Sequence, residues 1–289
     1  MSKIEPLTKN LWVAQSAVFA TNSALLLDAG SCYLVDPGIT PTELDHIVAF
    51  VAGSRATLRG IVLTHAHWDH LLGPERFPQA PVIAQDAYRA LLRRHASDLI
   101  RQVTDWRTET DVPQERSFVP PNPDVTFSKQ LRLYLGPTTL RVLATPGHAP
   151  DHCSLYESRS GLLWAGDMLS DLEVPMVMDT FAAYRQTLRR LAALEIRSLV
   201  PGHGTPTTDP REIHDRFAGD LVYLGEVYDC AAKAVEQGAE LAETLDCCVS
   251  IPFAQPDSYP NAHRWNIEQA YLEAGGKVTG IAGWAQDWA

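Results

Sequence analysis

The sequence predicts an α+β fold with two similar layers of strands and helices, followed by a helical C-terminal extension. Short apolar runs typical of strands precede an amphipathic helix within residues 11–105, and the same order returns within residues 125–195. From residue 208 onward, apolar residues recur almost entirely at helical spacing. The 289 residues are enough for one large domain with an extension. We therefore expect a first domain over residues 1–207 and a helical extension over residues 208–289.

The first layer is expected to begin with a meander of three short strands. Apolar runs at residues 11–18, 24–28 and 32–35 are separated by Asn22-Ser23 and by Gly30, which favour turns. The segment Thr40-Pro41-Thr42-Glu43 is a capping box with proline at the first helical position, so it predicts a helix start. The expected buried face of this helix consists of Leu44, Ile47, Val48 and Val51. The remaining elements expected here are strands at residues 60–63 and 81–84, a helix through residues 88–103 and a proline-rich loop at residues 111–124.

The second layer and the extension follow the same logic. Strands are expected at residues 131–135, 140–144, 153–157, 162–165 and 198–200. A helix over about residues 179–195 carries apolar side chains at helical spacing. In the extension, Asp209-Pro210-Arg211-Glu212 is a second capping box, which predicts the start of a long amphipathic helix. Prolines at residues 252–260 interrupt the helical pattern.

The excess of acidic over basic residues disfavours nucleic acid as a substrate. The chain has 35 Asp and Glu against 24 Lys and Arg, giving a formal net charge of −11. Proteins that bind phosphate backbones need clustered positive charge, and no such cluster accompanies the histidine-rich segment at residues 64–70. We therefore expect a small-molecule substrate and no nucleic-acid partner. The sequence does not set the oligomeric state, and a homodimer is compatible with it.

The five cysteines are Cys32, Cys153, Cys230, Cys247 and Cys248, and no CxxC pair occurs. Adjacent Cys247 and Cys248 are expected to be small buried residues on a helix rather than a disulfide or a metal-binding pair. Residues 1–10 lack the apolar centre of a signal peptide, and no apolar stretch approaches the length of a membrane span. These features lead us to expect a reduced, cytoplasmic protein without membrane association.

The segment Thr64-His65-Ala66-His67-Trp68-Asp69-His70 follows the apolar run of residues 60–63. Three imidazoles and one carboxylate thus lie within six positions at the end of an expected strand. Neutral imidazole and carboxylate are ligands that suit a divalent ion such as zinc. A solvated polar loop is the alternative, but further ligand-type residues occur downstream and favour a metal site.

Those downstream residues are His148, Asp167 and His203. Each lies just after an expected strand, in a glycine-containing loop. Glycine allows sharp turns and close backbone approach, so such loops can direct their side chains to one point. A single histidine after a strand is more often a hydrogen-bonded structural residue than a ligand. The three loops together with the HxHxDH segment favour a shared metal site.

The full set resembles that of the metallo-β-lactamase-fold superfamily of hydrolases, over about residues 8–207. The resemblance implies a four-layer αββα sandwich with metal ions at one edge, between the two sheets. It further implies one metal ion held by His65, His67 and His148, a second held by Asp69, His70 and His203, and Asp167 as the bridging ligand. Asp36 matches a family position with a structural role near the metal site. We expect two divalent ions, with zinc favoured and iron or manganese as alternatives.

General metal chemistry is consistent with such a site. Two nearby cations need anionic charge between them, and a bridging carboxylate supplies it. A hydroxide that bridges two such ions is a nucleophile near neutral pH. Asp69 is the expected catalytic residue, because it can orient this hydroxide and pass a proton to the leaving group. The resemblance to hydroxyacylglutathione hydrolases, thioesterases and lactonases implies hydrolysis of a small ester, thioester or lactone.

Two other activities of the same fold are alternatives. An iron-dependent persulfide dioxygenase is disfavoured, because such enzymes carry a Gly-Cys-Gly-Arg-like signature after the Asp, where this chain has Met168-Leu169-Ser170-Asp171. Di-iron redox members have Glu at the second ligand position, which is His67 here. A β-lactam hydrolase is disfavoured, because true β-lactamases of this fold generally lack a bridging Asp at the position of Asp167. A binding protein without activity is expected to have lost ligands, and none is missing.

Several positions near the expected site have two interpretations. His152 either supports a ligand as a hydrogen-bond partner or caps its own loop. His263 is expected to lie on the surface, with a substrate contact as the alternative. The apolar segment of residues 172–178 either packs under the next helix or forms a hydrophobic lip for an acyl group. Residues 97–123, which include Trp106, are a candidate lid because they are long for a connection. Arg211, Arg216 and Arg264 could bind the carboxylates of a glutathione thioester, but the sequence does not place them at the site.

Overall fold

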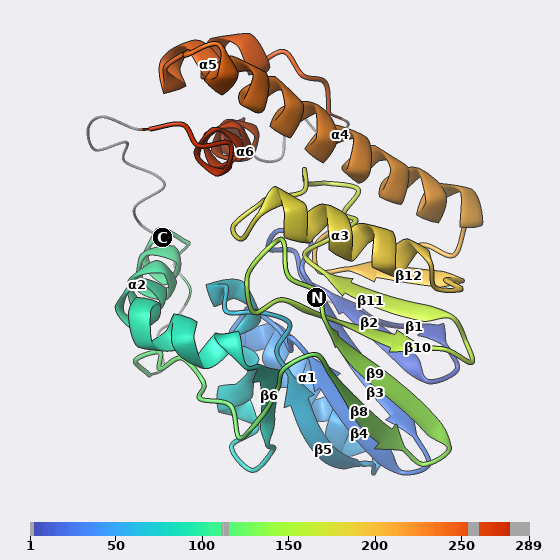
Figure 1. The fold of residues 1–289 in the computed structure, drawn as a ribbon. Coiled ribbons are helices and arrows are strands. Elements are labelled where there is room, and N and C mark those ends of the chain that lie inside the picture. Colours follow the sequence, from blue (N-terminus) through green and yellow to red (C-terminus); the bar gives the residue numbers. More distant parts are fainter. Residues whose placement is uncertain (1–2, 111, 113–115, 254–259, 278–289) are drawn as a thin grey trace.

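Two β-sheets lie face to face at the centre of the structure, and helices cover their outer faces (Figure 1). The structure is a computed structural model, and it describes residues 3–110, 112, 116–253 and 260–277. The architecture is the αββα sandwich with C-terminal helices that the sequence predicts. None of the helices in the described part of the chain is long and apolar enough to cross a membrane.

The first sheet has seven strands in chain order, and the second has five in the order β12-β11-β10-β9-β8. Strands of the first sheet are β1 Ile4–Thr8, β2 Leu11–Gln15, β3 Asn22–Asp28, β4 Ser31–Val35, β5 Thr57–Val62, β6 Val82–Gln85 and β7 Val125–Phe127. Strands of the second sheet are β8 Gln130–Leu135, β9 Thr138–Ala144, β10 Cys153–Glu157, β11 Leu162–Gly166 and β12 Ser198–Pro201. The first sheet begins antiparallel and becomes parallel from β4 to β7, while the second is antiparallel except for the pair β11 and β12.

The helices are α1 Pro41–Ser54, α2 Ala87–Glu109, α3 Phe181–Ala192, α4 Pro210–Glu236, α5 Leu241–Cys248 and α6 Pro260–Glu273. Short 3₁₀ turns occur at Trp68–His70 and Gly73–Arg76. In Figure 1, α3 covers the second sheet and α4 lies on α3, while α5 and α6 pack on α4, with α6 on the side of α4 that faces α2. The expected boundary between residues 207 and 208 stays a prediction, because α4 shares one apolar cluster with α3 and the second sheet.

Consecutive apolar residues within a strand contribute to different cores, which explains why these strands appear in the sequence as unbroken apolar runs. Leu34 packs with α1 and α2 on the outer face of the first sheet, whereas its neighbour Val35 packs between the sheets. In the same way, Leu163 faces α3 and α4, and Trp164 faces the first sheet. A sheet covered on both sides needs apolar residues at both alternating positions. The covered sheets form the rigid support for the loops at the strand ends.

Local sequence signals place most helix starts correctly. The capping box at Thr40 forms as predicted, with Glu43 Nα donating to Thr40 Oγ1 and the Glu43 carboxylate accepting from Thr40 Nα. Val48, expected on the buried face, is instead 36% exposed. The second predicted capping box is wrong: Asp209 caps α4 by accepting from Arg211 Nα, but the Glu212 carboxylate accepts from Thr207 Oγ1. Glu212 also pairs with Arg216 one turn along the helix, which draws its side chain away from the cap.

Two strands, a helix end and the cysteine pairing differ from expectation. β1 and β7 are short edge strands of mixed composition, so their sequences carry no clear alternation. Residues 97–109 of the candidate lid belong to helix α2 rather than to a connecting loop, with Trp106 only 8% exposed, and the lid role stays a prediction. Residues 111 and 113–115 of that segment lie outside the described residues.

Cys248 is buried as expected, but it forms a disulfide with Cys230, and Cys247 is exposed. The pairing joins α4 to α5, a contact that sequence spacing does not reveal.

Candidate metal centre

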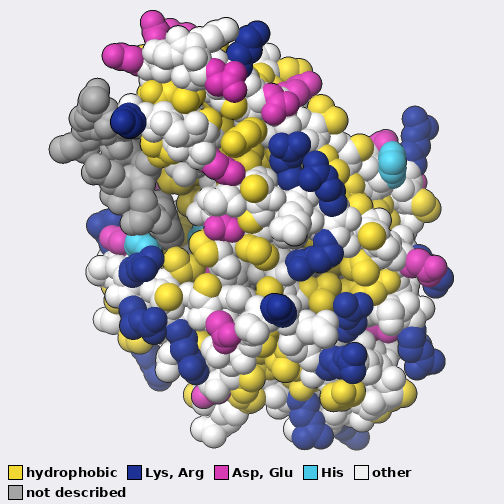
Figure 2. Space-filling model, viewed as in Figure 1, with side chains coloured by type: hydrophobic (Ala, Val, Ile, Leu, Met, Phe, Trp, Pro, Cys, Tyr) yellow, Lys and Arg dark blue, Asp and Glu magenta, His cyan; other side chains and the backbone are white. Residues whose placement is uncertain are grey.

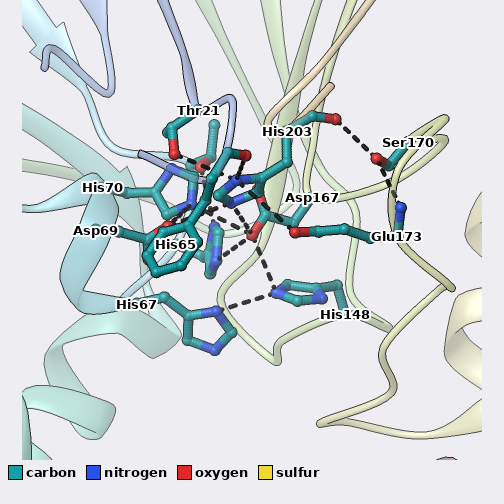
Figure 3. A network of polar contacts seen from close by, with 12 residues as sticks. Thr21, His65, His67, Asp69, His70, His148, Asp167, Ser170, Glu173 and His203 are labelled. Carbon is teal, nitrogen blue, oxygen red and sulfur yellow. Dashed lines mark hydrogen bonds and ion pairs between the residues drawn. The ribbon is translucent and has the colours of Figure 1, made fainter. Parts of the chain in front are cut away.

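The structure brings all seven predicted ligands together from loops at the ends of strands in both sheets (Figure 3). Four of them follow β5, and the others follow β9, β11 and β12. Their ligand atoms form two groups within which the atoms lie no more than 4.8 Å apart. One group is His65, His67, His148 and Asp167, and the other is Asp69, His70 and His203. Apart from Asp167, which the resemblance gives as a bridge and which is grouped here with the first set, this division matches the two ligand sets implied by the resemblance.

Asp167 lies between the two groups. Its Oδ2 is 3.3 Å from His65 Nε2 and 3.5 Å from His148 Nε2 in the first group. The same oxygen is 3.2 Å from His70 Nε2 and 3.4 Å from His203 Nε2 in the second. One carboxylate oxygen within reach of four imidazole nitrogens is the arrangement that a bridging ligand requires.

Three buried atoms at this centre lack a hydrogen bond within the described part of the structure: His65 Nε2, His70 Nε2 and Asp167 Oδ1. The two imidazole nitrogens face the Asp167 carboxylate at ion-pair distance, but the geometry is not that of a hydrogen bond. Buried polar atoms are rarely left unpaired, because each costs about 1–3 kcal/mol. Nitrogen and carboxylate donors aimed at common points therefore fit a pair of divalent ions such as zinc.

The far sides of the ligand rings are held by hydrogen bonds that direct Nε2 toward the centre. His70 Nδ1 lies 3.1 Å from Asp36 Oδ2, and the Asp36 carboxylate also accepts from Thr64 Nα and Oγ1. His148 Nδ1 is 3.0 Å from the Met176 carbonyl, and His203 Nδ1 is 3.0 Å from the Phe19 carbonyl. Such partners fix ring orientation in metal sites. Asp36 thus occupies the structural position near the centre that the resemblance implies.

Burial and neighbouring charge divide the imidazoles into two sets. Burial lowers the pKa of His65 well below its ordinary value, lowers that of His67 to about 4 and lowers that of His148 to about 3. Burial opposes charge at His70 and His203 too, but Asp167 and the other nearby carboxylates outweigh it and hold their pKa well above the ordinary range. The first set is ready to bind a metal ion as neutral imidazole, while the second must release protons first.

The two central carboxylates are held in the ionised form. Burial alone would raise the pKa of Asp69 and Asp167. His70 and His203 outweigh this effect, so the pKa of Asp69 falls to about 2 and that of Asp167 falls well below its ordinary value. Both groups therefore carry negative charge at neutral pH, which is what a cation site needs.

His152 supports the centre from behind without joining either ligand group. Its Nδ1 donates to the Thr145 carbonyl at 3.0 Å, and its Nε2 accepts from Asp167 Nα at 3.1 Å. Burial lowers its pKa to about 3, in keeping with a neutral ring that accepts at Nε2. Of the two interpretations of His152, the structure favours support of a ligand, through the backbone of Asp167 rather than its carboxylate.

Gly202 allows the loop after β12 to approach Asp167. A Cβ atom at Gly202 would lie 2.0 Å from Asp167 Oδ1, far inside van der Waals contact. A backbone hydrogen bond joins the two loops as well, because Gly202 Nα donates to the Gly166 carbonyl. Glycine in this loop is therefore needed for the close approach of its backbone to Asp167 as well as for sharp turning.

The sequence model of the metallo-beta-lactamase superfamily matches residues 17–203 of this chain, which include every predicted ligand. The chain belongs to the metallo-β-lactamase superfamily. It is 29% identical to a hydroxyacylglutathione hydrolase of Francisella tularensis subsp. novicida, over 68% of this chain and 64% of that protein. The chain thus spans somewhat under two thirds of this relative.

Solved structures of the superfamily share the fold. A metallo-beta-lactamase family protein from Thermus thermophilus aligns with a TM-score of 0.68 and 23% identity, over 93% of this chain and 95% of that one. The sec-alkylsulfatase Pisa1 from Pseudomonas sp. aligns with a TM-score of 0.75 and 15% identity, over 96% of this chain and 51% of that one. At these identities the likeness shows the fold alone. In both cases the alignment extends over the C-terminal helices, beyond the matched superfamily region.

A cavity of about 250 Å³ opens onto the metal centre of this superfamily member. Besides five of the predicted ligands, it is lined by Trp68, Gln102, Glu173, Val174, Met176, Met178 and Ala262. The lining includes no Lys or Arg among the described residues. Glu173 lies 3.9 Å from His203 Nδ1, and burial raises its pKa to about 7. The sequence singled out the segments that contain Glu173 and Gln102, as a candidate lip and a candidate lid, but not these two side chains, because neither belongs to a ligand motif.

The segment of residues 172–178 both packs under helix α3 and lines the cavity. Val174 and Val177 are buried in the apolar cluster with α3, and Val174, Met176 and Met178 line the cavity. Helix α6 fixes this loop: Asn266 Oδ1 accepts from Val177 Nα, and Trp265 Nε1 donates to the Val177 carbonyl.

The C-terminal helix α6 therefore forms part of the wall of the site. Ala262 lines the cavity, and Asn266 Nδ2 donates to the Pro175 carbonyl next to the carbonyl that holds His148. The expected surface position of His263 is wrong: this residue is 4% exposed, with Nδ1 at 2.8 Å from Tyr223 Oη. No motif in the sequence indicates these contacts, which depend on how α6 packs on α4.

Proposed function

We propose that this superfamily hydrolase cleaves a small ester, thioester or lactone with a pair of divalent metal ions, zinc being favoured. The observation that carries the proposal is the position of Asp167 Oδ2, within 3.5 Å of four imidazole nitrogens drawn from two ligand groups. Bound ions of this kind supply a Lewis acid for the carbonyl and a water activated near neutral pH. His65, His67 and His148 would hold one ion, Asp69, His70 and His203 the other, and Asp167 both.

Asp69 is the proposed catalytic residue. Its carboxylate faces the cavity, lies 3.2 Å from His203 Nε2 and is ionised at neutral pH, with its pKa lowered to about 2. An ionised carboxylate at this place can orient the attacking water by accepting a hydrogen bond at Oδ, and can take up the water's proton as the water oxygen bonds to the acyl carbon. It can then deliver the proton to the leaving alkoxide or thiolate as the bond to the acyl carbon breaks.

The lining of the cavity favours an uncharged acyl substrate. Trp68, Met176 and Met178 offer apolar and polarisable surface beside the ligands. A glutathione thioester carries carboxylates that need cationic partners, and the described lining offers none while it includes Glu173. We therefore propose an uncharged ester or lactone in preference to the thioester named by the Francisella relative.

The substrate class, the cellular location and the oligomeric state are proposals as well. The net charge of −11 supports a small-molecule substrate rather than nucleic acid. On the face shown in Figure 2, Lys and Arg side chains are spread over the surface rather than gathered in one continuous patch. A cytoplasmic location stays a prediction too, and the Cys230–Cys248 disulfide is unusual for that compartment. A homodimer remains compatible with the sequence.

The test combines metal analysis with a substrate panel. Protein purified without added metal is expected to contain two zinc ions per chain and to hydrolyse uncharged aryl esters or lactones faster than a glutathione thioester. His214→Ala, an exposed histidine on α4, serves as the matched control and should retain metal and turnover. One iron per chain with oxygen uptake on a persulfide would overturn the proposal in favour of a dioxygenase. Preferential turnover of a β-lactam would overturn it in favour of a lactamase.

A further inference from the structure

Three cysteine sulfurs meet where α4 and α5 pack together, far along the chain from the His and Asp ligands. Cys230 lies on α4, and Cys247 and Cys248 are the last two residues of α5. Cys230 and Cys248 form a disulfide, while Cys247 is free and exposed. The Cys247 sulfur lies 3.9 Å from the Cys230 sulfur and 3.6 Å from the Cys248 sulfur.

This placement is poorly suited to thiol–disulfide exchange. A thiolate attacks a disulfide along the extension of the sulfur–sulfur bond, so that the leaving sulfur lies opposite the incoming one. Cys247 instead lies beside the bond, at similar distances from both sulfurs. The Cys247 thiol is also engaged elsewhere, because it donates to the Thr244 carbonyl at 3.2 Å. The three sulfurs form the corners of a triangle, which suits a shared ligand better than an exchange reaction.

We propose that, once the disulfide is reduced, these three cysteines bind one thiophilic divalent cation of the zinc class. Zinc–thiolate bonds of about 2.3 Å in a tetrahedron place sulfurs about 3.8 Å apart. The two distances from Cys247, 3.6 and 3.9 Å, already match this spacing. Cys230 and Cys248 need only separate to the same distance after reduction. The exposed side of Cys247 leaves the fourth position to water.

The reaction balances with an external thiol as reductant, or with a phosphine that takes its oxygen from water and becomes a phosphine oxide. Two equivalents of a monothiol convert the Cys230–Cys248 disulfide to two thiols and are themselves oxidised to one disulfide. The cation then replaces the protons of the three thiols, and the protons pass to solvent. The oxidised form holds the same two helices by a covalent bond, so the cluster has two alternative forms, a disulfide with a free thiol and a three-thiolate cation site.

The surrounding charge favours a cation. Glu240, Glu243 and Asp246 are exposed on α5 or at its start. Figure 2 shows acidic side chains gathered at the end of the molecule that α5 forms in Figure 1. Cys247 and Cys248 also lie at the carboxyl end of α5, where the helix dipole attracts positive charge. Both effects raise the local concentration of cations near the exposed Cys247.

The probe that tests this site is cadmium, because a thiolate bound to cadmium gives an ultraviolet charge-transfer band and imidazole or carboxylate ligands do not. The whole protein is reduced with a phosphine, freed of reductant without air and titrated with cadmium. We expect the band to saturate at one equivalent of cadmium per chain, counted in addition to the cadmium that the His and Asp centre binds. The band should be absent from the oxidised protein. Three thiols should become protected from a thiol reagent at the same point. No band in the reduced protein would overturn the proposal.

Variants separate this site from other thiols. Cys247→Ser is expected to remove the band, or lower its cadmium affinity at least about a hundredfold. Cys32→Ser, in the core of the sandwich, should leave the band unchanged. A band of full strength in Cys247→Ser would show that other sulfurs bind the cadmium and would contradict the proposal. The comparison of oxidised and reduced wild-type protein needs no variant, so it holds even where a substitution impairs folding. The cadmium band is independent of the proposed hydrolytic function.

Discussion

The His and Asp centre of the sandwich and the C-terminal helices contribute to the site in different ways. The centre is built from short loops at strand ends, on two sheets that are covered on both faces, and three of the four loops carry their ligand beside a glycine. The helices contribute through backbone contacts: Asn266 and Trp265 hold the loop whose Met176 carbonyl orients His148. The difference teaches that the metal ligands are a local property of the sequence, while the positioning of one of them, His148, depends on how a distant helix packs.

The largest expected effect is at the shared ligand of the centre. Asp167→Ala removes the charge between the two ligand groups, so both ions should bind more weakly and turnover should fall on the order of a thousandfold or more. Metal content by mass spectrometry and kcat/KM for the best ester measure the two effects. His214→Ala is the control. Full activity in Asp167→Ala would contradict its bridging role.

A smaller effect is expected where α6 holds the site. Asn266→Ala leaves Val177 Nα and the Pro175 carbonyl without their partners, which should lower the free energy of unfolding by about 1–3 kcal/mol for each group. Because the loop carries the partner of His148, kcat should fall about tenfold while one metal ion is retained less tightly. Exposed Asn261 on the same helix provides the matched control, Asn261→Ala. Equal stability and kcat in the two variants would show that α6 is not needed to position the centre.

The two sets of imidazoles predict a pH dependence of metal binding. Nearby carboxylates hold the pKa of His70 and His203 above the ordinary value, so both are protonated in the metal-free protein at neutral pH. Metal ions need neutral imidazole, so uptake at neutral pH should release about two protons, and affinity should rise with pH until the pH passes the raised pKa of these two histidines. Calorimetry in buffers of different ionisation enthalpy measures the protons released. Uptake without proton release would contradict the assigned charges.

The same histidines affect the stability of the metal-free protein in the opposite direction. A raised folded-state pKa gives stability that is complete below the unfolded pKa and is lost as the pH rises through the folded value. The metal-free protein should therefore have a falling Tm as the pH rises above about 7, and the metal-loaded protein should not. Thermal unfolding with and without chelator distinguishes the two forms.

The smallest expected effect concerns substrate charge. Glu173→Gln removes a carboxylate from the cavity, so turnover of an anionic thioester should rise about fivefold relative to an uncharged ester. The ratio of kcat/KM values for the two substrates is the measurement. An unchanged ratio would show that Glu173 does not contribute to substrate selection.

The predictable part of the site is the part carried by unusual residue types in short segments. His65, His67, Asp69 and His70 stand together in the sequence, and His148, Asp167 and His203 each follow an apolar run beside a glycine, so their convergence could be predicted. Most strands of the sandwich are also predictable, because they are short apolar runs with clear turn signals, whereas their αββα arrangement is what the resemblance to the superfamily implies. Edge strands such as β1 carry no such pattern.

The unpredicted residues act through long-range contacts between common residue types. Asn266 lies about ninety positions from the backbone groups that it binds. Cys230 pairs with Cys248 only because α5 packs on α4, and His263 is buried by the same helices. Glu173 faces the centre from a segment that reads as apolar. Polar residues in helices are usually solvated, so without the structure nothing marks these as different.

Anomalous diffraction at the zinc absorption edge tests the central claim most directly. The account predicts two zinc peaks on either side of the Asp167 carboxylate, about 3.5–4 Å apart, one beside His65, His67 and His148 and the other beside Asp69, His70 and His203. Crystals grown with zinc that show a single peak, or none within reach of Asp167, would contradict it.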